Sequence, residues 1–477
     1  MALAARTTPY RARVFRRGLV TGLVYFAGTL YWVIPVMDGY GELPFGVAVL
    51  VGALLIVFLS LYPGLFAVVT AAGVRRFGVN GLWVAPAVWV SAEWVRSWFA
   101  SGFGWGTLGS SQATVIPVVQ LASVVGVYGL SAFVALVSTA AAIVALGGRR
   151  VAPIGVAVLF VIVCVAGMVR VSGGALLTAG SPLRVGLVQG NIEQAQKWDP
   201  QFRGIIIDRY MSLSREALRT GAALVIWPEA ATPFYFDLEE PWAAPIRQLA
   251  AERQTPFLIG TDELVRGPTR PEDKYYNSAV LVGADGRSHG VYRKMRLVPF
   301  GEFVPFQRLL FFVGPLVQAV SNFSHGTEPV VFDAGGGRRV SVSICYESIY
   351  PWISRAFVAR GSQLLATITN DAWFGRSSAA YQHFEQGAIR AVEEGRYIVR
   401  AANTGISGAV DPYGRVLAAT SLFEPAVVPV DVRLLDHRTI YSRLGDVAVW
   451  LSLAVTAWTL FMSRLALRSP GEGGRRR

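Results

Sequence analysis

The chain of 477 residues has few of the residue types that build disulfide frameworks and metal sites, with two cysteines and four histidines. Cys164 lies in the middle of a long apolar run, where the expected role is that of a buried, inert thiol. Cys345 is therefore left without a disulfide partner in the chain. No metal-ligand spacing links the histidines, which are His289, His325, His383 and His437. The sequence thus argues against a disulfide scaffold and predicts no bound metal.

Lysine is also scarce, because arginine supplies nearly all of the positive charge. The only lysines are Lys197, Lys274 and Lys294. Lys294 lies in the segment YRKMRLVPFGEFVPF, between an expected strand and a loop punctuated by proline and glycine. A surface position is the default for any single lysine, but an arginine-rich chain that keeps a lysine here indicates a need for a compact point charge.

Charged residues make up only 16% of the chain, against 53% hydrophobic residues, and the mean hydropathy is +0.44. These values exclude an ordinary soluble protein and predict several membrane spans. Apolar runs long enough to cross a bilayer lie at about 17–36, 44–72, 82–99, 122–147, 152–171 and 446–465. The net charge of +13 is concentrated in arginine clusters that adjoin these runs. This placement indicates that the clusters mark the cytoplasmic ends of spans, as the positive-inside rule describes, rather than a nucleic-acid-binding surface.

Six crossings would place both termini in the cytoplasm. The loops at 37–43 and 100–121, which contain no lysine or arginine, would then lie outside. The predicted organisation is an N-terminal transmembrane domain at 1–180, an extracytoplasmic domain at 181–435, and a C-terminal transmembrane helix with a basic cytoplasmic tail at 436–477.

The segment SGFGWGTLGSSQ, residues 101–112, is glycine-rich and aromatic. It neither follows a strand nor begins a βαβ unit, so an interfacial turn with an aromatic anchor is favoured over a phosphate-binding loop. A lipid-binding role at the outer face stays open. Glu93 and Arg96 lie within a predicted span, at a spacing that allows pairing on one helix face, in a structural or a lipid-facing role.

Strands alternate with helices from Leu183 onward, which predicts a layered α/β domain large enough for its own core. Helices are expected at 201–220, 241–253 and 378–394, and the segment YIVRAANTGISGAVDPYGRVL is interpreted as a strand pair. Functional side chains in such folds gather where strands end. Glu229, Cys345 and the pair Asn370–Asp371 all lie at such positions.

Two interpretations of Cys345 stand side by side. A lone cysteine in a strand is commonly a small buried hydrophobe. A nucleophilic cysteine instead needs a base and a cation nearby. A pairing with His325 or His383 is conceivable, but neither has a recognisable context, so both are interpreted as surface or loop histidines. Carboxylates and lysines are then the remaining partners.

Three motifs resemble the nitrilase superfamily, which uses Glu, Lys and Cys in that chain order. They are VIWPEAATPF with Glu229, YRKMRLVPFGE with Lys294, and VSICYES with Cys345. The whole chain, including VQGNIEQAQKW, LVPFGEFVPF, TNDAWFG and the SGFGWGTLGSSQ loop, is similar to the apolipoprotein N-acyltransferase family. The resemblance implies a polytopic α-helical membrane domain and an α/β nitrilase-like domain, an αββα sandwich, on the outer side of the bacterial inner membrane.

The resemblance also implies an activity without a cofactor. A fatty acyl chain would pass from a phospholipid, through a thioester on Cys345, to the α-amino group of the N-terminal lipid-modified cysteine of an apolipoprotein. Glu229 would act as general base, and Lys294 with the N–H after Cys345 would stabilise the oxyanion. The remaining matches to functional positions are Glu302, Tyr346, Glu347 and, for acceptor handling, Trp198. Partners would be these two substrates and the membrane, with no nucleic acid.

Some expectations stay open. Family members often have eight spans, and the match to this chain begins at about the third of them. The chain is then either a short form, or its assigned start lies downstream of the true one. Apolar loops at 303–306, 309–313 and 373–374 are expected either to dip into the bilayer or to pack internally. The rival functions are a membrane-tethered amidase that uses the same triad and a non-catalytic protein with a degenerate domain. The intact triad argues against the second rival.

Overall fold

The computed structural model describes residues 2–39, 41, 43–303 and 323–468. The chain divides into two compact units. A helical unit contains Met1–Ile34, Phe45–Val169 and Asp446–Arg477, and an α/β unit contains Pro35–Pro44 and Arg170–Gly445. The extracytoplasmic domain predicted at 181–435 lies wholly within the α/β unit.

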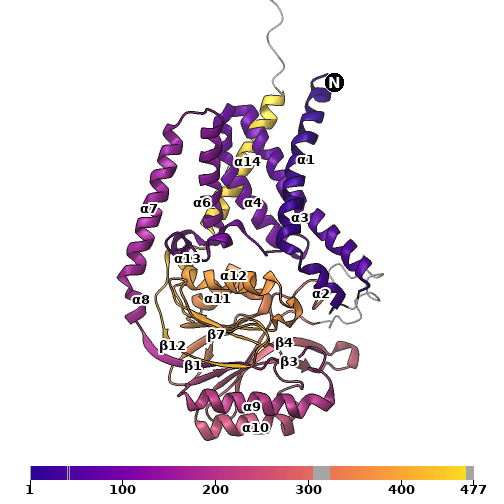
Figure 1. Cartoon of the computed structure of the whole chain (residues 1–477), viewed down its shortest axis with the longest axis vertical. Helices are drawn as coiled ribbons and strands as arrows, with labels where there is room; N and C mark the ends of the chain where they lie inside the picture. The colour runs from indigo at the N-terminus through magenta and orange to yellow at the C-terminus, as the bar shows by residue number, and fades with distance from the viewer. Residues whose placement is uncertain (1, 40, 42, 304–322, 469–477) are drawn as a thin grey trace, which may run out of the picture. The chain divides into compact units, whose positions relative to one another are not determined.

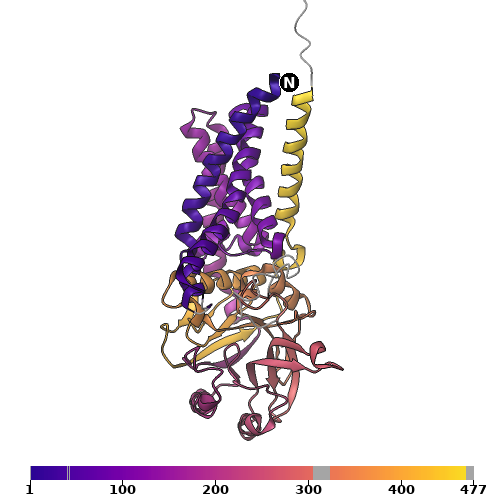
Figure 2. The ribbon, with the colours of Figure 1, turned by 90° about the vertical axis from the view of Figure 1, so that its right-hand side faces the viewer.

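Long apolar helices build the helical unit, where α1, α3, α4, α6 and α14 pack against one another (Figures 1 and 2). The elements are α1 (Ala2–Leu30), α3 (Phe45–Phe77), α4 (Ala85–Trp98), α6 (Ala122–Ala145), α7 (Val151–Gly173) and α14 (Val447–Arg468). A short α2 (Val33–Gly39) follows α1, and a 3-10 turn, η1 (Gly78–Val84), joins α3 to α4.

Among the described residues, four helical segments are long and apolar enough to cross a membrane, or five if the bent pair of α1 and α2 is counted as one span. The first of the four, Phe45–Ser101, is 57 residues long and includes two predicted spans, one on α3 and one on α4. Each of the six predicted spans therefore falls on helix. The number of crossings and the side on which each loop lies stay predictions.

The glycine-rich loop at 101–112 is anchored by the two charged residues of α4. Both are buried, with Glu93 4% and Arg96 3% exposed. Glu93 Oε1 accepts hydrogen bonds from the N–H of Leu108 at 2.6 Å and from Trp89 Nε1 at 2.8 Å, and Arg96 Nη1 donates to the carbonyl of Trp105 at 2.7 Å. Of the two roles that the sequence left open, these contacts support the structural one, because each side chain satisfies backbone groups of the loop.

In the described part of the α/β unit the strands form two six-stranded sheets. One has the order β12-β1-β2-β3-β4-β5 and the other β11-β10-β9-β8-β7-β6. The strands of the first are β1 (Ser181–Gln189), β2 (Leu224–Ile226), β3 (Phe257–Val265), β4 (Lys274–Val282), β5 (Ser288–Arg293) and β12 (Ala426–Leu434). Those of the second are β6 (Phe332–Asp333), β7 (Arg339–Ile344), β8 (Leu364–Thr369), β9 (Ile398–Ala402), β10 (Gly408–Val410) and β11 (Val416–Ala419).

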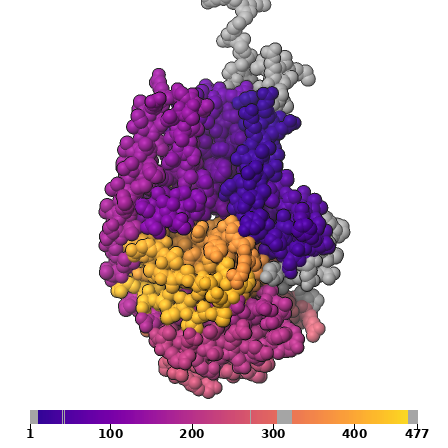
Figure 3. Space-filling model, in the orientation of Figure 1, coloured from indigo at the N-terminus to yellow at the C-terminus, as the bar shows by residue number. Residues whose placement is uncertain are grey.

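Helices cover the outer faces of the two sheets, which confirms the predicted αββα sandwich (Figure 1). The helices α9 (Arg203–Arg219) and α10 (Glu240–Arg253) share one core with strands of the first sheet, centred on the fully buried Trp227. The second sheet is covered by α11 (Pro351–Ala359) and α12 (Ser378–Glu394), and a short α13 (Ile440–Leu444) ends the unit. On the face seen in Figure 3, a late segment of the chain (yellow) lies against an earlier one (magenta), in agreement with the pairing of β12 with β1.

The arrangement of the strands brings together the strand ends that carry the candidate functional residues. In each sheet three neighbouring strands are parallel, β1 with β2 and β3, and β7 with β8 and β9. The carboxyl ends of parallel strands in one sheet meet at one edge, so the residues after β7 and β8 are neighbours. The segment after β2 of the other sheet meets them through the hydrogen bond from the N–H of Asn370 to Glu229 Oε2 at 2.8 Å. Glu229, Cys345 and Asn370 follow these three strands.

One element prediction was wrong. The segment expected to form a strand pair at 397–417 forms three strands, β9, β10 and β11, and the DPYG turn joins the second to the third. The predicted helices at 201–220, 241–253 and 378–394 agree with α9, α10 and α12 within two residues. Alternation of strands and turns gave too little signal to separate β9 from β10, because the loop between them is only five residues long.

Candidate active site

Cys345 lies at a sharp bend directly after β7. Its φ of 52° is in the left-handed region, which a residue with a Cβ rarely adopts, and residues Cys345–Ile349 continue as a 3-10 turn. The side chain is 8% exposed. Such strained backbone persists only where surrounding contacts hold it in place, and it is common at active sites. The bend places Cys345 at the edge of the sheet where β7 and its parallel neighbour β8 end.

Glu229 is held by donors from three separate segments. Its Oε1 accepts from Lys294 Nζ at 3.1 Å and from Asn277 Nδ2 at 2.7 Å, and its Oε2 accepts from the N–H of Asn370 at 2.8 Å. Burial raises the pKa of Glu229, but Lys294, Asn277 and Lys197 outweigh burial and lower it below the ordinary value. The carboxyl group is therefore ionised at neutral pH and ready to accept a proton.

Lys294 sits between two carboxylates. Its Nζ donates to Glu302 Oε1 at 2.8 Å as well as to Glu229, and the side chain is 1% exposed. Burial lowers the pKa of Lys294, but the attraction of Glu229 and Glu302 exceeds this effect and raises the pKa well above its usual value. The group is a permanent buried cation, so it provides the compact point charge that the sequence predicted.

Electrostatics keep the thiol of Cys345 protonated at rest. Burial, followed by repulsion from Glu229, raises the pKa of Cys345 far above the ordinary value, although Lys294 acts in the opposite direction. A preformed thiolate is thereby disfavoured. Deprotonation needs a base that acts during the attack, and Glu229 is an ionised carboxylate near enough to influence the thiol.

Asn277 on β4 was not singled out from the sequence. Its Nδ2 donates to Glu229 Oε1 at 2.7 Å and to Glu302 Oε1 at 2.9 Å, so one amide ties both carboxylates together. It lies in YNSAVLVGADG, where a polar residue interrupts the apolar alternation near the start of a strand. That interruption was the available signal, but many edge residues share it.

We expect Asn277→Ala to move the acidic limb of the pH–rate profile to higher pH by about one unit. A hydrogen bond to a charged group contributes about 1.5–3 kcal/mol, and 1.36 kcal/mol corresponds to about one pKa unit. Loss of the donor raises the pKa of Glu229, so the base becomes protonated at a higher pH than in the wild type. The measurement is the rate of Cys345 acylation between pH 4 and 8, with the exposed Asn80→Ala as control. An unchanged limb would contradict the assignment of Glu229 as the base.

Glu347 connects the lysine segment to the cysteine bend. Its carboxylate is fully buried and accepts from the N–H of Ile344 at 2.8 Å, of Met295 at 2.6 Å and of Arg296 at 3.0 Å, and from the hydroxyl of Tyr292. Glu347 thereby joins the backbone next to Lys294, at Met295, to the backbone next to Cys345, at Ile344.

The other two residues that the resemblance indicated have different surroundings. Tyr346 is 6% exposed, and its hydroxyl accepts a hydrogen bond from Tyr350 at 2.9 Å. Trp198 is 49% exposed, so an indole face is available at the surface of the α/β unit. Trp373 is 38% exposed, whereas residues 304–306 and 309–313 lie outside the described residues.

A buried lysine, Lys197, and a half-buried aspartate, Asp262, lie near Glu229. Lys197 is 2% exposed, and its Nζ donates to the backbone carbonyl of Glu229 at 3.1 Å. Burial lowers the pKa of Lys197 to about 8, and burial raises the pKa of Asp262 to about 7. The sequence drew attention to Lys197 only as one of three lysines, because its partner is a carbonyl group far along the chain.

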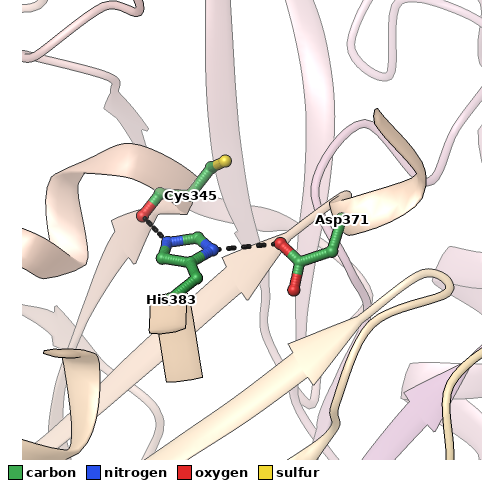
Figure 4. Close-up of side chains that lie close together, drawn as sticks. All are labelled: Cys345, Asp371 and His383. Carbon is green, nitrogen blue, oxygen red and sulfur yellow. Dashed lines mark hydrogen bonds and ion pairs between the residues drawn. The ribbon is translucent and has the colours of Figure 1, made fainter. Parts of the chain in front are cut away.

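The interpretation of His383 as a surface or loop residue was wrong. His383 lies on α12, is fully buried, and contacts the carbonyl oxygen of Cys345 through Nε2 and Asp371 Oδ1 through Nδ1, each at 3.0 Å (Figure 4). His325, in contrast, is exposed. Side-chain ligand atoms of Cys345, Asp371 and His383 lie within 4.8 Å of one another, a grouping that sequence spacing did not predict.

This cluster has the donor types of a zinc site, but a protein cation already occupies it. Arg400 Nη2 donates to Asp371 Oδ2 at 2.8 Å and lies 2.9 Å from His383 Nδ1. A metal ion bound to the same two atoms would face the guanidinium charge at short range. The cluster is therefore better described as a hydrogen-bond network than as a metal centre.

Known protein families match both units of this chain. A family model described as a carbon–nitrogen hydrolase matches residues 184–440, and one described as the apolipoprotein N-acyltransferase N-terminal domain matches residues 1–140. An apolipoprotein N-acyltransferase of Geobacter metallireducens is 41% identical over 454 residues, 93% of this chain and 86% of that protein. One of Shewanella oneidensis is 34% identical over 450 residues, 91% of this chain and 84% of that protein.

Among solved structures, an amidase from Nesterenkonia sp. aligns with 54% of this chain and 92% of that chain, at 24% identity and a TM-score of 0.40. The relatives from the two bacteria instead cover both units of the chain. The resemblance inferred from the sequence motifs is thus confirmed: this chain belongs to the apolipoprotein N-acyltransferase family, and its α/β unit has the carbon–nitrogen hydrolase fold.

Proposed function

We propose that the protein transfers a fatty acyl chain from a phospholipid to the α-amino group of an apolipoprotein's N-terminal diacylglyceryl-cysteine. The observation that carries the proposal is the 3.1 Å contact between Lys294 and Glu229 beside the ends of β7 and β8, in a chain whose relatives are named for this reaction. Glu229 accepts from the N–H of Asn370, which follows β8, and Cys345 follows the neighbouring strand β7. The geometry supplies a base, a cation and a nucleophile, and the helical unit supplies contact with lipid.

In the first half-reaction the Glu229 carboxylate takes the thiol proton as the sulfur of Cys345 attacks the ester carbonyl carbon. The ester oxygen becomes an oxyanion, which the Lys294 ammonium group and the backbone N–H of Tyr346 stabilise. The C–O bond then breaks, and Glu229 returns the proton to the leaving lysophospholipid oxygen. The acyl chain remains on Cys345 as a thioester.

In the second half-reaction the α-amino nitrogen of the acceptor attacks the thioester carbon, and Glu229 takes a proton from that nitrogen. The same two donors stabilise the second oxyanion. The C–S bond breaks, Cys345 regains its proton, and the acceptor leaves as an amide. A site shielded from water favours this aminolysis over hydrolysis of the thioester.

Both substrates are lipids anchored in a bilayer, so a multi-pass protein meets them in two dimensions. In this proposal the α/β unit lies on the periplasmic face of the inner membrane, consistent with arginine clusters at the opposite ends of the spans. The exposed indoles of Trp198 and Trp373 suit an interfacial position, because an indole has an apolar body and a polar N–H.

The deciding experiment is intact mass spectrometry of the purified protein after incubation with phosphatidylethanolamine vesicles. We expect a mass gain of one acyl chain that hydroxylamine removes and that Cys345→Ala lacks. Cys164→Ala is the matched control and should keep the adduct, because Cys164 lies on α7 and not in the α/β unit. Addition of a synthetic diacylglyceryl-cysteine peptide should discharge the adduct and yield the N-acylated peptide.

The outcomes separate the candidate functions. An adduct that the peptide discharges supports acyl transfer to an amine. Absence of any adduct on folded wild-type protein contradicts the proposal, and release of ammonia from small amides would then favour the amidase alternative. An adduct that water, but not the peptide, discharges would indicate a lipid hydrolase.

A further inference from the structure

Two side chains contact the carbonyl oxygen of Cys345, one from the 3-10 turn that follows β7 and one from α12. His383 Nε2 lies 3.0 Å from this oxygen, and Ser348 Oγ donates to it at 3.0 Å. Both side chains are at least 98% buried. A carbonyl oxygen has two lone pairs, so two donors saturate it and define its direction.

A peptide group is planar, so fixing its carbonyl also fixes its N–H. The group that contains the carbonyl of Cys345 also contains the N–H of Tyr346, and in a trans peptide these two bonds point in opposite directions. Figure 4 shows the carbonyl oxygen directed at the imidazole ring and the thiol directed away from it. The N–H of Tyr346 therefore points away from the ring, toward the side of the nucleophile.

The ring of His383 is itself held in place. Arg400 Nη2 contacts His383 Nδ1 at 2.9 Å and Asp371 Oδ2 at 2.8 Å, while Thr369 Oγ1 donates to Asp371 Oδ1 at 2.8 Å. Burial, and then the charge of Arg400, lowers the pKa of His383, so the ring is neutral near pH 7 and carries one N–H. With this proton on Nε2, the ring donates to the carbonyl of Cys345, and Nδ1 accepts from Arg400. The 3.0 Å approach of Nδ1 to Asp371 Oδ1 is then a contact between two acceptors, which the guanidinium of Arg400 bridges because it donates to both residues.

We propose that His383 and Ser348 are positioning residues of the oxyanion site: they clamp the carbonyl of Cys345 and thereby aim the N–H of Tyr346 at the developing oxyanion. The two contacts also hold Cys345 at its strained φ of 52°, because a residue with a Cβ would otherwise relax to a negative φ. His383 does not act as the base for the thiol. This inference rests on the proposed function, because the oxyanion forms only during acyl transfer.

A matched pair of substitutions at one position separates the clamp from a general effect on folding. The amide nitrogen of glutamine can occupy the place of the histidine Nε2, so His383→Gln keeps a donor to the carbonyl. His383→Asn is shorter and reaches only toward Asp371 and Arg400. Exposed His289→Gln serves as the surface control.

Two reactions of Cys345 are compared in these variants. Acylation by phosphatidylethanolamine passes through an oxyanion, whereas alkylation by iodoacetamide is a direct displacement at carbon and does not. We expect His383→Asn to slow acylation about 10- to 100-fold, with an unchanged KM for the phospholipid. This effect is smaller than the rate loss of about 10²- to 10³-fold that follows removal of an oxyanion donor. Alkylation, read from the mass of the peptide that contains Cys345, should change less than about 3-fold. His383→Gln should restore most of the acylation rate.

Acylation of His383→Asn at the wild-type rate would overturn the proposal. So would a fall in the alkylation rate as large as the fall in the acylation rate, because the ring would then act on the thiol itself. Where His383→Asn does not unfold cooperatively, Ser348→Ala replaces it, because that change removes the second donor with little loss of volume. Its acylation should fall about 10-fold, and no fall would reject the clamp. Failure of the proposed function itself looks different, since the wild type would then form no acyl-enzyme.

Discussion

Glu229→Gln should lower the rate of Cys345 acylation by about 10²- to 10⁴-fold, the usual contribution of a general base. The amide has nearly the same shape as the carboxylate but cannot accept the thiol proton. All the neighbours of the carboxylate are donors, at 2.7–3.1 Å. The NH₂ group of the new amide must therefore face a donor, either Lys294 and Asn277 or the N–H of Asn370. The loss is therefore both chemical and electrostatic.

The measurement is a quenched time course of acyl-enzyme formation at saturating phospholipid, followed by intact mass. Glu252→Gln, on the exposed face of α10, is the matched control and should keep the wild-type rate. The thermal unfolding midpoint should be followed in parallel, because Lys294 keeps Glu302 as a partner and the fold should survive. A Glu229→Gln protein that acylates within tenfold of the wild type would mean that another group accepts the proton.

Glu347→Ala should destabilise the α/β unit by about 4 kcal/mol or more. The substitution leaves three backbone N–H groups and the hydroxyl of Tyr292 without their acceptor in a fully buried place. Each buried polar group left unsatisfied costs about 1–3 kcal/mol, and losses above 4–5 kcal/mol are exceptional for single substitutions. At about 2–4 °C per kcal/mol, the unfolding midpoint should fall by about 10 °C.

Catalysis should fall with stability in this variant, because Met295 and Arg296 lose the contact that holds the adjacent Lys294 near Cys345. Glu347→Gln keeps the volume and one acceptor oxygen, so its unfolding midpoint should lie between those of the wild type and Glu347→Ala. Glu252→Ala removes an exposed carboxylate and should leave the midpoint within about 1 °C. Equal unfolding midpoints for Glu347→Ala and Glu252→Ala would show that the hydrogen bonds of Glu347 have no structural role.

Several features followed from the sequence alone because each depends on local pattern. Hydropathy placed the spans on helices, strand–helix alternation predicted the layered α/β unit, and the motifs around Glu229, Lys294 and Cys345 led to the family. Period and composition are local properties, so they can be read without knowing which strands are neighbours. The scarcity of lysine was informative in the same way, since it drew attention to Lys294.

Only the tertiary structure decided how these residues interact. Asn277 is 48 residues from Glu229, Arg400 is 17 from His383, and His383 is 38 from Cys345. No periodicity connects positions so far apart. The pairing of β2 with β3 and of β3 with β4 brings Asn277 to Glu229 in one sheet. In the other sheet the parallel registers of β7, β8 and β9 bring Cys345 and Arg400 close to His383 of α12. His383 was misjudged for the same reason: an isolated histidine carries no sign of burial until the helix that bears it packs against the bend at Cys345. Sequence thus determined the local elements and the identity of the reacting groups, whereas packing determined which donor faces which acceptor.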